Sequence, residues 1–209
     1  MKVTIIGAGN MGRAIGTRAV AGGHEVEIVD RDPAEAQKLA DDLGGSATAL
    51  EPGAAFGGEV VVLALYYPGI KDAVGQYADQ LAGKVVVDIT NPVNTDTWDS
   101  LATPPGTSSA EEVQQLVPQG TAVVKAFNTT FARTVAGGEV AGQQLDILIA
   151  GDDEEAKRKV SQLVSDGGLR PVDVGPLRRA EQLEHLGLLH ITLQQPLELG
   201  FGSTVKLHP

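Results

Sequence analysis

The sequence predicts an α/β fold in which helices cover both faces of a doubly wound parallel sheet. Strand and helix signals alternate along all 209 residues, an order typical of βαβ units joined into one parallel sheet. Two expected strands contain unbroken valine runs, at 60–62 and 85–87. Runs of β-branched residues indicate strands that are buried on both faces. The chain is therefore expected to bury its sheet between two helical layers.

The first strand and helix carry the most specific motif. Residues 3–6, Val-Thr-Ile-Ile, predict a buried strand and lead directly into Gly-x-Gly-x-x-Gly at 7–12. In such a motif Gly7 allows a sharp turn, Gly9 leaves room for a pyrophosphate, and Gly12 lets the next helix pack against the strand. The N-terminus of that helix presents unpaired N–H groups and a positive dipole end to phosphates. The motif predicts a Rossmann-type dinucleotide site, and the alternative is a glycine-rich turn without a ligand.

A second strand, expected over 25–30, ends in Asp30, about 20 residues beyond the glycines. An acidic residue at this place can hydrogen-bond an adenosine ribose. Helix 33–43 follows, with Pro33 in the first turn, where proline is tolerated. A short strand near 46–48 completes this part of the chain.

The alternation continues to the C-terminus. Residues 151–159 place acids before bases, which suits the helix dipole and indicates a solvated helix face. Residues 103–109 are rich in Pro, Ser and Thr and are expected to form a loop at the sheet edge. The expected strands are 2–6, 25–30, 46–48, 59–65, 84–88, 121–126, 146–150 and 170–174. The expected helices are 11–22, 33–43, 69–81, 109–117, 153–166 and 178–195.

We expect a single domain over 1–209, with a dinucleotide-binding core over 1–150. A short C-terminal α/β extension over 151–209 is expected to add a helix, a strand, a helix and a short terminal strand. This extension is much shorter than the helical substrate domain that many nicotinamide enzymes carry. The acceptor site is therefore expected in loops at the carboxyl ends of the strands, beside the topological switch point.

Composition narrows the classes of function. The chain has no cysteine, so it has no disulfide or thiol chemistry and suits a reducing cytoplasm. Its net charge of −11 argues against nucleic acid as a partner. The longest apolar run, Val60 to Tyr67, is too short for a membrane span, and Met1 leads directly into the first strand, without a signal peptide. We expect a cytoplasmic protein with a small-molecule redox substrate and no membrane insertion.

The expected loops offer no persuasive proton donor for reducing a carbonyl or an imine, although such reactions normally need one. His185 and His190 lie five residues apart on the last helix and lack partners for a metal set, which favours solvated or capped histidines. Lys125 lies at the end of an expected buried strand. A lysine at such a place can be a catalytic amine, but it is more commonly a salt-bridge or phosphate partner. We therefore predict no catalytic acid or base, no metal, and a flat redox ring that accepts hydride directly.

Three strand-end loops can hold two stacked rings and exclude water, because they offer small, apolar and aromatic residues. For Tyr66 and Tyr67, ordinary loop packing is the alternative. The loops read Ala64-Leu65-Tyr66-Tyr67-Pro68, Thr90-Asn91-Pro92-Val93 and Phe127-Asn128-Thr129-Thr130.

These segments resemble a known family over nearly the whole chain. The sequence resembles the NADPH-dependent F420 reductases (coenzyme F420:NADP oxidoreductases) and the related cytoplasmic reductase domain of STEAP-type ferric reductases. The Lys-Ala-Phe-Asn-Thr segment at 125–129 is the more specific block, since many families share the glycine turn. The resemblance implies hydride transfer between NADP(H) and a deazaflavin or flavin, with both rings at the carboxyl edge of the sheet. The matching blocks are 6–12, 85–92, 123–129, 150–153 and 168–177.

Two positions depart from the deazaflavin enzymes. There a Ser-Arg pair and a nearby Lys bind the 2′-phosphate, whereas this chain has Asp30 and Arg31, with Glu35 at the place of the Lys. Asp30 favours the free ribose of NAD, while Arg31 can stack on adenine and pair with a 2′-phosphate, which keeps NADP open. Asn128 stands where the deazaflavin enzymes carry His and matches the metalloreductase-like version, which leaves FMN or FAD open as acceptor.

We therefore expect an oxidoreductase that transfers hydride between NADP(H), or alternatively NAD, and coenzyme F420 or a related flavin. The alternatives are a reductase of another small acceptor, such as an imine or a quinone, and a non-catalytic redox sensor plugged by Tyr66 and Tyr67. A homodimer is expected, because family members pair and leucines recur at helical spacing in the last helix, although these leucines can also be intrachain core. Arg133, Arg178 and Arg179 are candidate cations for the acidic tail of F420, or merely surface arginines. The expected cofactor-binding residues are Gly7, Ala8, Gly9, Asn10, Met11, Gly12, Asp30, Arg31, Ala64, Leu65, Tyr66, Asn91, Pro92, Asn128 and Thr129.

Overall fold

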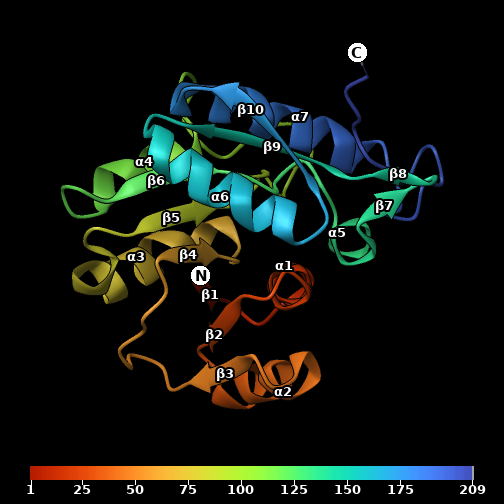
Figure 1. Ribbon diagram of the computed structural model, residues 1–209. Coiled ribbons are helices and arrows are strands. Elements are labelled where there is room, and N and C mark those ends of the chain that lie inside the picture. Colours follow the sequence, from red (N-terminus) through yellow and green to blue (C-terminus); the bar gives the residue numbers. More distant parts are fainter. Residues whose placement is uncertain (209) are drawn as a thin grey trace.

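Eight strands form one sheet with helices on both faces (Figure 1). The computed structural model describes residues 1–208. The strands of the sheet are β1 (Lys2–Ile6), β2 (Glu25–Val29), β3 (Ala47–Leu50), β4 (Val60–Leu63), β5 (Val85–Asp88), β6 (Ala122–Lys125), β9 (Asp146–Gly151) and β10 (Arg170–Gly175). A separate hairpin consists of β7 (Glu139–Val140) and β8 (Gln143–Gln144). The order across the sheet is β10-β9-β6-β5-β4-β1-β2-β3.

The doubly wound parallel arrangement is confirmed for the six strands from β6 to β3. The exception is β9, which runs antiparallel to β6, while β10 runs parallel to β9. A parallel neighbour requires a crossover that returns the chain to the amino edge. Residues 126–145 instead leave β6 and enter β9 at the same edge, which reverses the direction of the last two strands.

Two helical layers enclose the sheet. The helices are α1 (Asn10–Ala21), α2 (Pro33–Leu43), α3 (Tyr67–Leu81), α4 (Ser109–Leu116), α5 (Ala132–Gly137), α6 (Glu154–Asp166) and α7 (Ala180–Thr192), with a 3₁₀ turn η1 (Leu177–Arg179) before α7. One core cluster joins the sheet to α1, α2, α5 and α6, and a second joins it to α3 and α4 (Figure 1). Val60 and Val62 belong to the first cluster and Val61 to the second, all fully buried. The valine runs therefore form strands buried on both faces, as predicted.

The C-terminal half differs from the expected elements in three ways. The six-residue helix α5 and the hairpin β7–β8 form where the sequence pattern predicts no element. Helix α7 ends at Thr192, three residues earlier than expected. The expected terminal strand is absent from the described chain: residues 203–208 are irregular, and Leu207 N donates to Asp146 Oδ2 (3.0 Å) instead of to a neighbouring strand.

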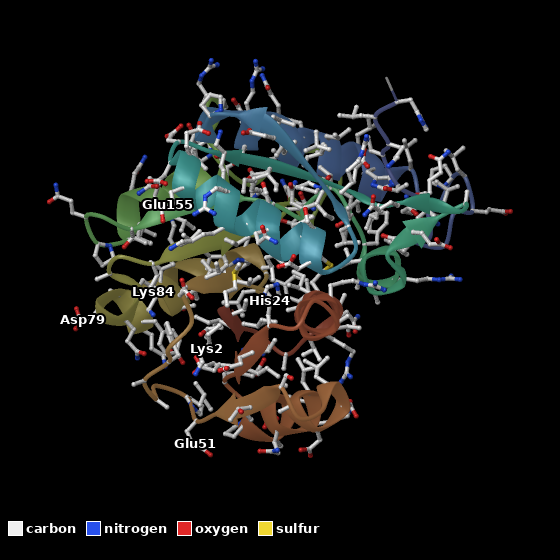
Figure 2. The ribbon with its side chains drawn as sticks, viewed as in Figure 1. Lys2, His24, Glu51, Asp79, Lys84 and Glu155 are labelled. Atoms are coloured by element: carbon white, nitrogen blue, oxygen red, sulfur yellow. The ribbon has the colours of Figure 1, made fainter. Side chains whose placement is uncertain are left out.

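Charged side chains lie at the amino edge of the sheet. Lys2, His24 and Lys84, labelled in Figure 2, each begin or precede a strand. Lys2 Nζ lies 3.3 Å from Glu27 Oε1. The charged run on α6 is solvated only in part: Glu155 is exposed (Figure 2), whereas Lys157 is buried and pairs with Asp173, contrary to the prediction. No helix within residues 1–208 is long and apolar enough to cross a membrane.

Candidate functional site

The three glycines of the first turn have different surroundings. Gly7 has φ +113°, and a Cβ there would lie 2.3 Å from Ala64 O. A Cβ on Gly12 would lie 2.0 Å from Gly7 O, whereas a Cβ on Gly9 would meet no atom of the described chain within 4 Å. Gly9 is also the N-cap of α1 and makes no side-chain capping hydrogen bond. Gly7 and Gly12 are therefore required by the fold, and Gly9 faces open space at a helix N-terminus.

Asp30 connects the end of β2 to this turn. Its Oδ2 accepts from Ala8 N (2.7 Å), and its Oδ1 accepts from Asp32 N (3.0 Å). Both carboxylate oxygens are thus already hydrogen-bonded to backbone. The next residue, Arg31, is exposed and has no ion-pair partner within residues 1–208.

The loops after β5 and β6 are joined through two asparagines. Asn128 Nδ2 donates to Asn91 Oδ1 (2.9 Å), and Asn91 Nδ2 donates to Asn128 O (2.6 Å). Asn128 Nδ2 also donates to Leu183 O in α7 (2.8 Å). The Asn128 side chain is 3% exposed, yet its Oδ1 has no hydrogen-bond partner in the described structure. Since a buried carbonyl oxygen normally has a partner, this atom is a candidate acceptor at the site.

The backbone before Asn128 is strained. Phe127 is buried and has φ +63°, a left-handed conformation that is rare for a residue with a bulky side chain. Thr130 holds this turn closed, because its Oγ1 donates to Phe127 O (2.7 Å). Strain of this kind clusters at functional sites, and here it redirects the chain from β6 toward Asn128.

Lys125 lies in a buried ion cluster and is not a free amine. Its Nζ donates to Asp88 Oδ2 (2.9 Å), Glu184 Oε1 (2.6 Å) and Thr90 O (2.6 Å). The Lys125, Asp88 and Glu184 side chains are all 0% exposed. Burial raises the pKa of Glu184, although the neighbouring Lys125 ammonium opposes the shift. Of the roles considered for Lys125, the structure supports the salt bridge.

The two tyrosines after β4 have different surroundings. Tyr66 is 91% exposed and is not packed into the loop. Tyr67 and Lys71 have the Tyr-x-x-x-Lys spacing of a candidate proton donor, at a place for which no proton donor is predicted above. However, the Tyr67 hydroxyl donates to Glu112 Oε2 (2.8 Å), and burial together with this bond raises the Tyr67 pKa to about 12. Tyr67 is therefore a poor proton donor at neutral pH.

A cleft of about 500 Å³ lies beside the glycine turn, between α1 and α5. Phe131 and Phe201 line the cleft and pack edge to face against each other, with ring centroids 5.1 Å apart. Arg13 pairs with Asp42 at 2.7 Å, while Arg133 is exposed. The candidate cations Arg178 and Arg179 lie in η1 and do not line this cleft. The lining residues are Asn10, Arg13, Ala14, Phe131, Ala132, Arg133, Ala136 and Phe201.

Comparison with known proteins agrees with the glycine turn and the sheet. The family model for coenzyme F420-dependent NADP oxidoreductases matches residues 2–92. The F420-dependent NADP reductase of Methanocaldococcus jannaschii is 30% identical over 207 residues, which cover 92% of this chain and 92% of that protein. The chain belongs to the F420-dependent NADP reductase family. Members of this family are named as oxidoreductases of NADP, in keeping with the dinucleotide turn.

Two further relatives extend the comparison. An Arthrobacter crystal structure, provisionally assigned as an F420-dependent NADP-reductase, superposes over 100% of both chains with a TM-score of 0.87 and 28% identity. The rat metalloreductase STEAP3 is 33% identical over 187 residues, or 90% of this chain. This chain spans only 36% of that metalloreductase. The family and the metalloreductase relationship suggested by the sequence are thus confirmed.

The C-terminal extension supplies site residues that sequence reasoning missed. A Cβ on Gly187 in α7 would lie 2.3 Å from Asn91 Oδ1, so α7 packs directly on that side chain. An isolated glycine inside a helix is a signal of close packing, and could have identified this contact. His190 donates from Nδ1 to Thr129 O (3.2 Å) and accepts at Nε2 from Ser203 (2.8 Å). Burial lowers the His190 pKa, so this histidine is neutral and capped, as predicted.

Proposed function

We propose that the protein transfers hydride between NADP(H) and coenzyme F420 or a related flavin. The proposal is carried by the open space at Gly9, at the N-terminus of α1, in a chain of this family. The first helical hydrogen bond runs from Arg13 N to Gly9 O (2.9 Å). The N–H groups of Asn10, Met11 and Gly12 precede it and have no helical acceptor. They suit a pyrophosphate, which helix N-termini favour through hydrogen bonds and the dipole.

For the nucleotide we propose NADP, with NAD as the alternative. The carboxylate of Asp30 already accepts from Ala8 N and Asp32 N, which directs it toward the turn. Arg31 is exposed next to it, and a guanidinium can bind a phosphate through two parallel hydrogen bonds. In this proposal Asp30 fixes the turn, and Arg31 recognises the 2′-phosphate.

We place the nicotinamide between the loops that follow β4, β5 and β6. The partnerless Asn128 Oδ1 is a suitable acceptor for the carboxamide N–H of nicotinamide. Ala64 and Leu65 lie against Gly7 and form the small, apolar side of the pocket. NADPH supplies a hydride from its nicotinamide ring, and the protein has to hold donor and acceptor carbons about 3–3.5 Å apart and exclude water. The remaining proposed pocket residues are Tyr66, Asn91, Pro92 and Thr129.

We place the acceptor near the cleft between α1 and α5. Phe131 and Phe201, which line it, offer aromatic surface to a flat ring. A net charge of −11 opposes an acidic ligand, so an acidic acceptor needs a local cation. Arg133 offers one at this cleft, whereas Arg13 is already paired with Asp42. FMN and FAD are the alternative acceptors.

The proposal is tested by mixing the pure protein with NADPH or NADH and each of F420, FMN and FAD while following nicotinamide absorbance. NADPH oxidation with F420 is the expected result, with NADH slower. No oxidation with any acceptor would leave the redox sensor as the better reading.

A second assay addresses imine and quinone acceptors, which require a proton donor. Tyr67→Phe removes the hydroxyl of the tyrosine in the Tyr-x-x-x-Lys pair. Unchanged F420 reduction in this variant is expected. A lost imine or quinone reductase activity would favour the small-acceptor alternative.

The cytoplasmic location and the homodimer stay predictions. An exposed apolar surface on the end of α7 and the following segment suits the proposed dimer, because large exposed apolar side chains often mark interfaces. It consists of Leu189, Leu193, Leu197, Leu199 and Phe201, which are 37–58% exposed.

A further inference from the structure

Every hydrogen of the Lys125 ammonium is already committed to a buried acceptor. An ammonium has three donors, and the acceptors are the carboxylates of Asp88 and Glu184 and the carbonyl of Thr90. Glu184 is held from its other side by Ser109 N, which donates to Oε2 (3.2 Å). Lys125 therefore has no donor left for a substrate, and any effect on hydride transfer must be indirect.

Two of the three partners of the ammonium, Thr90 and Glu184, are next in sequence to a residue of the asparagine network. Thr90 directly precedes Asn91, whose side chain accepts from Asn128. Glu184 directly follows Leu183, whose carbonyl accepts from Asn128 Nδ2. The cluster thus connects the end of β5, the end of β6 and α7 immediately behind the two asparagines.

Helix α7 has little freedom against these loops. At Gly187 it approaches Asn91 so closely that a single added Cβ would overlap with the amide, 2.3 Å from Oδ1. A shift of α7 would therefore move Asn91 and withdraw the Leu183 acceptor from Asn128 at the same time.

We propose that Lys125 is a positioning residue for hydride transfer: by binding Glu184 of α7 and Thr90 of the β5 loop, it fixes Asn91 and Asn128 and hence the nicotinamide. The inference rests on the proposed function. Hydride transfer depends steeply on geometry, and a misplacement of about 1 Å can lower a rate roughly 100-fold. Nucleotide affinity depends mainly on the glycine turn and should change little.

The main test is the double variant Lys125→Met with Glu184→Gln. Lys125→Met alone would leave two buried carboxylates without their positively charged partner, which is strongly destabilising. The double variant removes one positive and one negative charge, so the net charge of the cluster is conserved. Asp88 keeps its hydrogen bond from Thr90 N (2.9 Å). What is lost is the connection from β6 to α7.

A second variant, Gly187→Ala, perturbs the same contact without changing any charge. Alanine is the better helix former, which favours folding of the variant, but its Cβ forces α7 away from Asn91. The matched control is Lys157→Met. This lysine is also buried and paired, with Asp173 at 2.8 Å, but on α6, away from the asparagines.

We expect kcat for F420 reduction to fall roughly 10- to 100-fold in both test variants, with KM for NADPH changed less than about threefold. With NADPH deuterated at the transferred position, the isotope effect on kcat should rise, because the chemical step becomes slower. Lys157→Met should lower the melting temperature but keep kcat within about twofold of wild type.

Wild-type kcat in the folded double variant and in Gly187→Ala would overturn the inference. If the double variant does not fold, Gly187→Ala decides alone. A kcat loss in Lys157→Met equal to that of the test variants would also overturn it, since general destabilisation would then suffice. Failure of the proposed function is distinguishable, because the wild-type protein would then show no hydride transfer at all.

Discussion

Substitutions at Gly9 and Gly12 should separate nucleotide binding from folding. Gly9→Val places a side chain where the described structure has no atom within 4 Å of a Cβ. Gly9 already has an extended backbone, with φ −69° and ψ −172°, that other residues adopt. Gly12→Ala, by contrast, places a Cβ 2.0 Å from Gly7 O, so the helix or the turn must move.

The two variants should differ in which free energy they change. Gly9→Val exchanges one N-cap residue for a poorer one, which costs at most about 1 kcal/mol of stability. Its side chain, however, blocks hydrogen bonds to a charged pyrophosphate, each of which contributes about 1.5–3 kcal/mol. Loss of two such bonds weakens binding by at least about 100-fold. Gly12→Ala overpacks the core and should cost about 1–3 kcal/mol of stability.

Urea unfolding and NADPH fluorescence titration measure these two quantities on the same samples. The expected pattern is near-normal unfolding with lost binding for Gly9→Val, and a lowered unfolding midpoint for Gly12→Ala. If Gly9→Val binds NADPH within about threefold of wild type, the pyrophosphate does not lie at this turn, and the proposed site is wrong.

Three further predictions concern stability, specificity and assembly. Although burial alone raises the pKa of Asp146, hydrogen bonds from Arg170 and a neighbouring lysine hold this pKa well below its usual range. A carboxylate with a depressed pKa stabilises the fold above its unfolded-state value of about 3.9 and loses this effect as the pH falls toward the folded-state pKa. Asp146→Asn should therefore lower unfolding free energy by about 1–3 kcal/mol at neutral pH, and the difference should shrink below about pH 4; a pH-independent difference would contradict this reasoning. Arg31→Ala should weaken NADPH binding about tenfold with little change for NADH, and equal losses for both nucleotides would show that Arg31 does not read the phosphate. Leu189→Glu with Leu193→Glu should convert a dimer to a monomer by light scattering, whereas a monomeric wild type would refute the dimer itself.

Local chemistry made the first βαβ unit predictable from sequence. The turn at Gly7 and the close packing at Gly12 depend on missing side chains, which the sequence states directly. The two valine runs likewise indicate burial on both faces without reference to any partner. Asp30 was placed correctly at the end of β2, but its bond to Ala8 N was not foreseeable, because the residue type alone does not say which donors surround it.

Long-range partners and strand directions were not predictable in the same way. A buried strand such as β9 has the same apolar pattern in either direction, so its antiparallel pairing with β6 depends on the path of the preceding loop. Helix α5 has six residues, too few to establish a helical period. Lys125 could be recognised as unusual, but its partner Glu184 lies 59 positions away, and no spacing rule connects them.

The extension over 151–209 takes part in the site that the first 150 residues begin. From α7 come the acceptor for Asn128, the second carboxylate of the Lys125 cluster and the glycine that lets the helix reach Asn91. Phe201, beyond α7, supplies a wall of the cleft beside α1. A core that ended at β9 would leave the Lys125 ammonium with one carboxylate fewer and Asn128 exposed on the side that α7 covers. The short extension therefore covers one side of the proposed site, and the single domain over 1–209 stays a prediction.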